Sequence, residues 1–300
     1  MPPSCGGIKF SAMRLALFPA CFNDALFPRT AVATVRLLEK LGQEVVVPLG
    51  QTCCGQIHFN TGYRKEAFRL LCRFLEVFSD GVHVQAIVAP SASCVAMVRE
   101  QYPELLGWAR DRGLVGGKRS ERLGRSLERV AGRTFELSEF LVRELGVVDV
   151  GARFPFRVAL HPTCHSIRGI DVGDAPVRLL TAVDGLELVD LERAEECCGF
   201  GGTFAVKNAD TSLAMMEDKL RSVRESGAQV LTAVDNSCLM HLAGGMRRGG
   251  WPGEVRVLHL AEILVGGGER GLGGVQGVGS PGEGRARGES MAPGDEGGRL

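Results

Sequence analysis

Short apolar runs recur along the chain and predict buried β-strands. The runs at 15–18, 86–89, 158–160 and 229–234 are mostly apolar and too short for helices, which is typical of strands buried in a parallel sheet. A proline closely follows three of them, and proline cannot continue a strand ladder. The runs at 45–47 and 186–191 indicate two further strands.

Amphipathic helices are expected between these strands. The segments 29–41 and 210–225 repeat apolar residues at helical spacing, and helical spacing also follows the runs at 86–89 and 229–234. The order strand, helix, strand, loop, helix, strand, helix therefore occurs twice. This order predicts an α/β fold of two duplicated, three-layer-like units with mainly parallel sheets.

Cysteines recur at a fixed offset between the two halves of the chain. Eight of the ten cysteines fall into a first foursome (Cys21, Cys53, Cys54, Cys94) and a second foursome (Cys164, Cys197, Cys198, Cys238). Corresponding members are 143 or 144 residues apart, and each foursome contains the sequence Cys-Cys-Gly. An internal duplication explains this spacing. Cys5 and Cys72 have no counterpart, and Cys72 is expected to be a small buried residue of an apolar helix.

Composition changes how these cysteines are interpreted. The 35 Lys and Arg residues balance 35 Asp and Glu residues, so no overall charge indicates nucleic acid as a partner. There is no apolar run of 18 residues to predict a membrane span, and the first residues lack a signal-peptide pattern. We therefore expect a cytoplasmic protein. In that reducing compartment, clustered cysteines are more typical of metal binding or redox chemistry than of disulfides.

The predicted topology brings each foursome to one edge of a sheet. All eight cysteines follow predicted strands, and open α/β sheets bind ligands beyond the carboxyl ends of their strands. Adjacent cysteines do not easily chelate one tetrahedral ion, but they can reach different irons of a cluster. The following glycines, Gly55 and Gly199, allow a positive φ or a close approach of the backbone.

These motifs resemble the duplicated cysteine-rich (CCG) domain family. The segments that match in kind are 51–56, 60–64 and 89–94, then 161–165, 197–204 and 235–240. The family includes a cysteine-rich component of heterodisulfide reductase, iron–sulfur subunits of glycolate and glycerol-3-phosphate oxidoreductases, and a small stand-alone member that acts in lactate utilisation. The likeness is greatest to the last, over about residues 13–264. It implies an electron-transfer subunit that helps to oxidise L-lactate to pyruvate with other subunits, including a second iron–sulfur protein.

The resemblance also implies the cofactor and its ligands. The two foursomes would hold one or two iron–sulfur clusters of the [4Fe–4S] type, which usually takes four cysteines. The wider family ends each set with Cys-x-x-Cys, where this chain has Ser91 and Asp235 as the first residue. Each half is thus one cysteine short of the noncubane cluster of the heterodisulfide reductase relative. Ser91 and Asp235 are expected to cap the following helices, with oxygen ligation as the alternative.

Two other functions remain as alternatives. One is a heterodisulfide or thiol–disulfide reductase subunit that uses an iron–sulfur cluster, which a full set of five cysteines in each half would favour. The other is a structural zinc protein, which paired Cys-x-x-Cys knuckles would favour. Two histidines lie next to the second foursome: His165 is a candidate hydrogen-bond donor to a cluster sulfur, and His161 is expected to pack at a strand end.

The domain organisation follows from the repeat. We expect a dispensable leader at 1–12, a first cysteine-rich domain at 13–109, a connector at 110–133 with a helix at 120–131, and a second cysteine-rich domain at 134–265. The segment 266–300 is rich in glycine and has few large apolar residues, which predicts a disordered tail.

Overall fold

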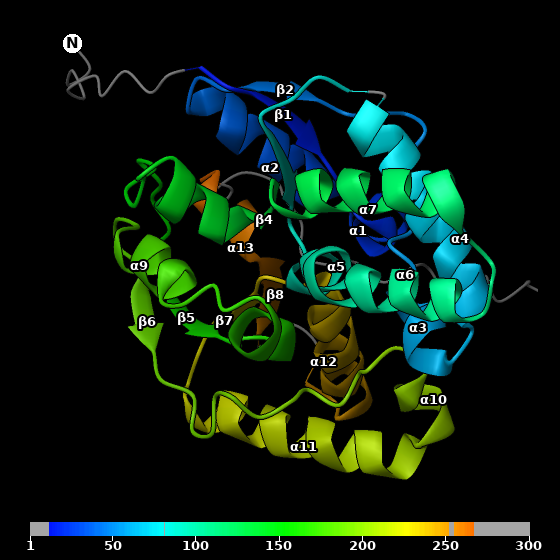
Figure 1. The fold of residues 1–300 in the computed structure, drawn as a ribbon. Coiled ribbons are helices and arrows are strands. Elements are labelled where there is room, and N and C mark those ends of the chain that lie inside the picture. Colours follow the sequence, from blue (N-terminus) through cyan, green and yellow to red (C-terminus); the bar gives the residue numbers. More distant parts are fainter. Residues whose placement is uncertain (1–11, 81, 252–254, 267–300) are drawn as a thin grey trace, which may run out of the picture.

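The computed structural model describes residues 12–80, 82–251 and 255–266. The expected leader at 1–12 and tail at 266–300 therefore lie, except for their residues 12 and 266, outside the described residues. The described part folds into two α/β units, and Figure 1 shows the strands of each unit enclosed by helices. Within these ranges, no helix is both long and apolar enough to cross a membrane.

Each unit contains a four-stranded parallel sheet. The first sheet has the order β2-β1-β3-β4, and the second has the order β6-β5-β7-β8. The strands are β1 (Arg14–Leu17), β2 (Glu44–Val46), β3 (Ala86–Ala89), β4 (Thr134–Glu136), β5 (Arg157–Leu160), β6 (Glu187–Val189), β7 (Val230–Ala233) and β8 (Arg256–His259). All six predicted strands are present, and the α/β class with duplicated parallel sheets is confirmed. β4 and β8 are additional strands that the apolar pattern did not predict.

Helices connect the strands and cover the sheets. In the first unit they are α1 (Cys21–Ala25), α2 (Pro28–Lys40), α3 (Gln56–Thr61), α4 (Arg64–Leu75), α5 (Ala92–Ala96), α6 (Tyr102–Asp111), α7 (Gly117–Ala131) and α8 (Leu137–Glu139). In the second they are α9 (Ala175–Thr181), α10 (Phe204–Lys207), α11 (Ala209–Glu225), α12 (Asn236–Arg248) and α13 (Leu260–Leu264). Four π-helical turns accompany them: η1 (Glu76–Asp80), η2 (Met97–Gln101), η3 (Phe140–Glu144) and η4 (His165–Gly169).

The segment 110–133 belongs structurally to the first unit. It contains α7, which packs against α4 and α6, and it leads into β4, which pairs with β3. A parallel strand needs a long crossover connection, and α6 and α7 supply it here. The second sheet therefore begins after β4, with β5, whereas the sequence placed residue 134 at the start of the second domain.

The two units contact each other through matching pairs of helices. α2 of the first unit packs against α13 of the second, and the corresponding helix α9 packs against α8. Likewise, α1 contacts α12, and η4 contacts α5. This exchange of equivalent contacts relates the halves by a pseudo-twofold axis, not by a simple translation. The larger cluster of buried apolar side chains includes residues of both units, such as the fully buried Leu37 and Leu264, and a smaller cluster lies within the second unit.

Glu136 makes the stability of the fold depend on pH. This carboxyl is completely buried at the end of β4, and its Oε2 accepts hydrogen bonds from the backbone N–H groups of Ser138 and Glu139. Burial raises the pKa of Glu136 from 4.5 to about 7. The pKa of Glu136 is higher in the folded protein than in the unfolded chain. The contribution of this carboxyl to folding stability is therefore complete below pH 4.5 and is lost as the pH rises through about 7. Through this group alone, the free energy of unfolding is therefore about 3 kcal/mol lower above pH 7 than below pH 4.5.

Glu136→Gln is therefore expected to stabilise the protein relative to wild type more at pH 8 than at pH 5. Glutamine retains an oxygen acceptor for the cap and cannot ionise. Thermal unfolding of both proteins at the two pH values measures the difference, and the comparison cancels every other titrating group. An equal difference between the two proteins at pH 5 and pH 8 would contradict the assignment.

Candidate metal centre

Strand ends and helix starts place all eight predicted cysteines on one cavity. Cys21 and Cys94 lie in the first turns of α1 and α5, and the first Cys-Cys-Gly segment follows β2. The second unit repeats this arrangement with η4, α12 and the loop after β6. The cavity has a volume of about 100 Å³, and both foursomes line it. We call it the thiol cavity.

Within the first foursome, the adjacent cysteines face different partners. The Cys21 thiol donates to Cys53 with an Sγ–Sγ distance of 3.5 Å, and Cys54 donates to Cys94 with an Sγ–Sγ distance of 3.3 Å. Cys54 is buried, whereas Cys21 and Cys53 are half-buried. The Cys-Cys dipeptide thus divides its side chains between two pairs that converge on the same space.

The second foursome repeats this pattern. Cys197 accepts a hydrogen bond from Cys164, and Cys198 pairs with Cys238. Cys198 is 1% exposed, so its sulfur is the most deeply buried of this set. The structure therefore brings together the four predicted residues of each half, and it brings the two halves to one cavity.

A left-handed glycine shapes each Cys-Cys-Gly segment. Gly55 has a φ of 89° and Gly199 a φ of 88°. Each glycine donates its N–H to the sulfur two residues earlier, Cys53 at 3.3 Å and Cys197 at 3.4 Å. A positive φ is unfavourable for residues with a Cβ. The glycine that follows the cysteine pair is therefore needed to turn the backbone N–H toward the sulfur.

These contacts separate the thiols by acidity. Hydrogen bonds from Cys21 and Cys54 lower the pKa of Cys53 to about 2, and the equivalent bonds lower the pKa of Cys197 to about 2. The pKa values of Cys54 and Cys198 are raised, because each is hydrogen-bonded to neighbouring thiols and is buried. In each half the thiolate form is thus favoured at one cysteine, Cys53 or Cys197. Thiolate is the form of cysteine that binds metals.

Ser91 and Asp235 cap helices, as expected from the sequence. The Ser91 hydroxyl accepts from the Cys94 N–H, and the Asp235 carboxylate accepts from the Ser237 N–H. The two residues also meet across the pseudo-twofold axis, where Ser91 Oγ donates to Asp235 Oδ2 at 3.2 Å. Asp235 Oδ2 accepts from the Ser93 N–H at 2.9 Å as well. The two positions that differ from the family pattern therefore bind the halves to each other.

Three further residues of the sequence analysis have defined places. Cys72 is half-buried on α4 and lines a surface depression with arginine side chains, away from the thiol cavity. His165 lies in the thiol cavity, with its Nε2 3.2 Å from the side-chain nitrogen of Gln56. His161 packs at the end of β5, and it also faces the thiols of Cys198 and Cys238. The sequence predicted that His161 packs at a strand end, but it did not predict that His161 lies close to Cys198 and Cys238.

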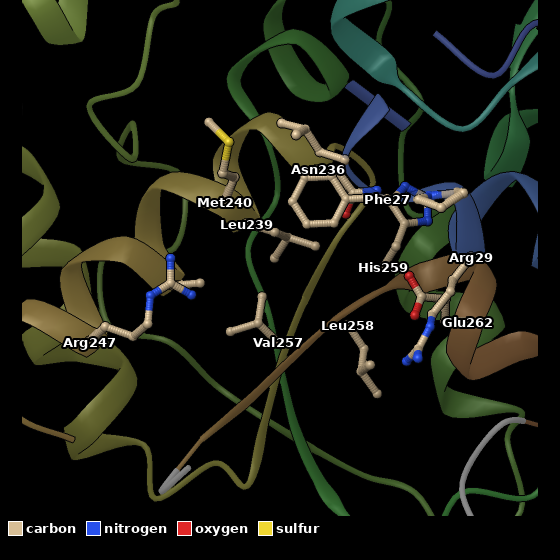
Figure 2. A pocket seen from close by; sticks show the side chains of 13 residues that line it. Phe27, Arg29, Asn236, Leu239, Met240, Arg247, Val257, Leu258, His259 and Glu262 are labelled. Atoms are coloured by element: carbon tan, nitrogen blue, oxygen red, sulfur yellow. The ribbon is translucent and has the colours of Figure 1, made fainter. Parts of the chain in front are cut away.

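A second cavity, of about 280 Å³, lies between the start of α2, α12 and β8. Figure 2 shows Leu239 and Val257 in its apolar middle, with Arg247 on one side and Arg29 beside Glu262 on the other. None of its lining residues is a cysteine. This cavity is therefore separate from the thiols. Asn236 lines it and donates hydrogen bonds from its side-chain nitrogen to Asn23 and Thr30.

The duplicated fold and the eight converging thiols define a protein built from two cysteine-rich CCG domains. The sequence profile of the cysteine-rich (CCG) domain family matches residues 15–99 and 158–243, one in each unit. The chain belongs to the lactate utilization protein A family. It is 43% identical to Lactate utilization protein A of an Exiguobacterium species over 251 residues, covering 83% of this chain and 96% of that protein. It is 40% identical to the Bacillus subtilis protein of the same name over 252 residues, covering 84% and 99%.

A solved structure supports the fold alone. A hypothetical protein from Helicobacter pylori superposes with a TM-score of 0.53 at 13% identity, over 84% of this chain and 48% of that chain. This chain thus matches about half the length of that protein.

Proposed function

We propose that this protein is an iron–sulfur electron-transfer subunit of a cytoplasmic, multi-protein system that oxidises L-lactate to pyruvate. The observation that carries the proposal is the convergence of two four-thiol sets on one cavity. The name of the relatives supports lactate as the substrate of the system. The other subunits of the lactate-oxidising complex, including a second iron–sulfur protein, would supply the remaining redox centres.

The thiols present fit an iron–sulfur group. Each half offers four cysteine sulfurs, the number of ligands that a [4Fe–4S] cluster takes. Their division into two close pairs around the Cys-Cys dipeptide lets the four sulfurs approach one group from different sides. We propose that each foursome holds one such cluster, which would pass electrons one at a time when bound.

The protein around the thiols would tune and protect this group. Gly55 and Gly199 direct backbone N–H groups at Cys53 and Cys197, and hydrogen bonds to ligand sulfurs adjust the reduction potential of a cluster. Cys54 and Cys198 are almost inaccessible to water, which limits solvent at the inner side of each foursome. Lactate oxidation also removes a hydrogen with two electrons, and that step needs an organic cofactor. We propose that a partner subunit performs it.

Anaerobic purification with iron and sulfide analysis and EPR tests the cofactor, and about eight irons per chain are expected for two [4Fe–4S] clusters. Zinc in place of iron would instead support the structural zinc alternative. The biological role is tested in the host: deletion of this protein is expected to impair growth on L-lactate but not on glucose. Wild-type protein should restore growth on lactate, and the Cys54→Ser variant should not. Normal growth of the deletion strain on lactate would contradict the substrate.

A further inference from the structure

His161 is a fully buried histidine that no polar group of the described residues satisfies. It follows β5, its side chain is 0% exposed, and neither ring nitrogen has a hydrogen-bond partner. A ring nitrogen of His161 and the sulfurs of Cys198 and Cys238 all lie within 4.8 Å of one another. Buried polar groups nearly always have a binding partner, so an unpartnered imidazole that faces two thiols indicates that a group normally binds there.

The first unit has an apolar residue at the equivalent position. The backbone N–H of Phe18 donates to the Val88 carbonyl at 2.9 Å, and that of His161 donates to the Thr232 carbonyl at 2.8 Å, so the two residues occupy the same place after their strands. The Phe18 ring packs edge-on against Phe74, with the ring centroids 5.0 Å apart. Apolar packing therefore accounts for Phe18. If packing were also the role of His161, a phenylalanine would fill that position equally well, so packing does not explain the two ring nitrogens of His161.

The chemistry of the three groups indicates a metal. Imidazole nitrogen and cysteine sulfur together bind iron and zinc, and they do so through the unprotonated nitrogen. A neutral imidazole offers one nitrogen lone pair to a metal, and within the described part of the chain neither ring nitrogen of His161 is engaged in a hydrogen bond. Separations below 4.8 Å allow small side-chain shifts to bring all three donors onto one metal atom.

We propose that His161 is a metal ligand of the second foursome, binding the same metal atom or cluster as Cys198 and Cys238. This inference rests on the proposed metal centres. The second half then provides five donors, four sulfurs and one nitrogen, whereas among the described residues no histidine lies within 4.8 Å of two sulfurs of the first foursome. The two halves of this duplicated protein thus hold chemically different centres, and only the second carries a nitrogen ligand.

The test uses protein with ¹⁵N-labelled histidine, purified anaerobically, reduced and examined by pulsed EPR. Wild type is expected to show strong nitrogen coupling at one of its centres. His161→Phe, which copies the first unit, is expected to lose this coupling, and the control variant His165→Gln is expected to retain it. His161→Cys should lose the coupling but keep the iron content, because it replaces one donor with another.

The outcomes separate this inference from the proposed function. Iron-loaded wild type without nitrogen coupling, or with only the weak coupling of an N–H···S hydrogen bond, would overturn the ligand role and leave the electron-transfer role intact. Wild type without iron would overturn the iron–sulfur function instead. In that case Co²⁺ added to the metal-free protein decides the inference: its ligand-field bands shift in His161→Phe if the imidazole binds metal, and identical spectra overturn it.

Discussion

Replacing Cys198 with serine is expected to remove the proposed metal centre of the second half and, with it, the proposed electron transfer through the protein. Cys198 is 1% exposed and its sulfur faces Cys238, so no water or neighbouring side chain can easily take its place. A serine hydroxyl remains protonated near neutral pH and is a poor ligand for iron. We expect the iron content to fall by about half, because one of two clusters is lost. Lactate-dependent activity with partner subunits should fall by more than about 100-fold, since even changes beside a metal ligand cost 10–100-fold.

Cys72→Ser is the matched control for this experiment. Cys72 is also a partly buried cysteine, and burial raises the pKa of its thiol, but it lies on α4 among arginine side chains. It faces neither foursome, so iron content and activity should stay at the wild-type level. If Cys72→Ser lost as much iron as Cys198→Ser, the loss would reflect general instability and the ligand assignment would be wrong.

The cysteine repeat predicted which thiols lie together, because the spacing of residues along the chain can be read directly from the sequence. Equal offsets between the foursomes required equivalent positions in two copies of one fold, and the apolar runs fixed those positions at strand ends. The same reasoning predicted the caps at Ser91 and Asp235, since capping is a local interaction between a side chain and the next helical turn.

Features that depend on tertiary contacts were not predictable. β4 has a single apolar residue, Phe135, and β8 includes Arg256 and His259, so neither forms a recognisable apolar run. Each becomes a strand because it pairs with the edge of an existing sheet, at β3 and β7. The proximity of His161 to the thiols depends likewise on residues 37 and 77 positions later in the chain, at Cys198 and Cys238. No local pattern around His161 records that contact.

The pseudo-twofold axis connects these observations. The contact of Ser91 with Asp235 joins the starts of the helices that carry Cys94 and Cys238. The backbone N–H of Ala92 also donates to the Val234 carbonyl at 3.3 Å across the same boundary. The thiol cavity therefore has walls from both units, and hydrogen bonds join these walls to each other. Ser91 and Asp235 thus provide a polar contact between the halves next to both foursomes.

Gly199→Ala is expected to destabilise the second Cys-Cys-Gly segment severely. Gly199 has a φ of 88°, and an added Cβ would lie 2.5 Å from the Ser212 carbonyl oxygen and 3.2 Å from Met215 Cβ. The carbonyl is backbone within α11, and the Ser212 hydroxyl already holds this loop by donating to the Gly199 carbonyl at 2.8 Å. The loop must therefore move away from α11, which displaces Cys198. The left-handed conformation and the steric clash together should cost about 3–5 kcal/mol.

Two other glycines separate these causes. Gly62 has a φ of 90° with nothing within 4 Å of its added Cβ, so Gly62→Ala measures the conformational cost alone, about 1 kcal/mol. Gly55 has a φ of 89°, and its added Cβ would be 3.4 Å from the Leu70 side chain, an ordinary contact. Thermal unfolding and iron content of the three variants should therefore rank Gly199→Ala as by far the most damaging, with iron lost from the second centre only. If Gly199→Ala behaved like Gly62→Ala, α11 would not hold the loop in place, and Cys198 would owe its position to the metal rather than to the fold.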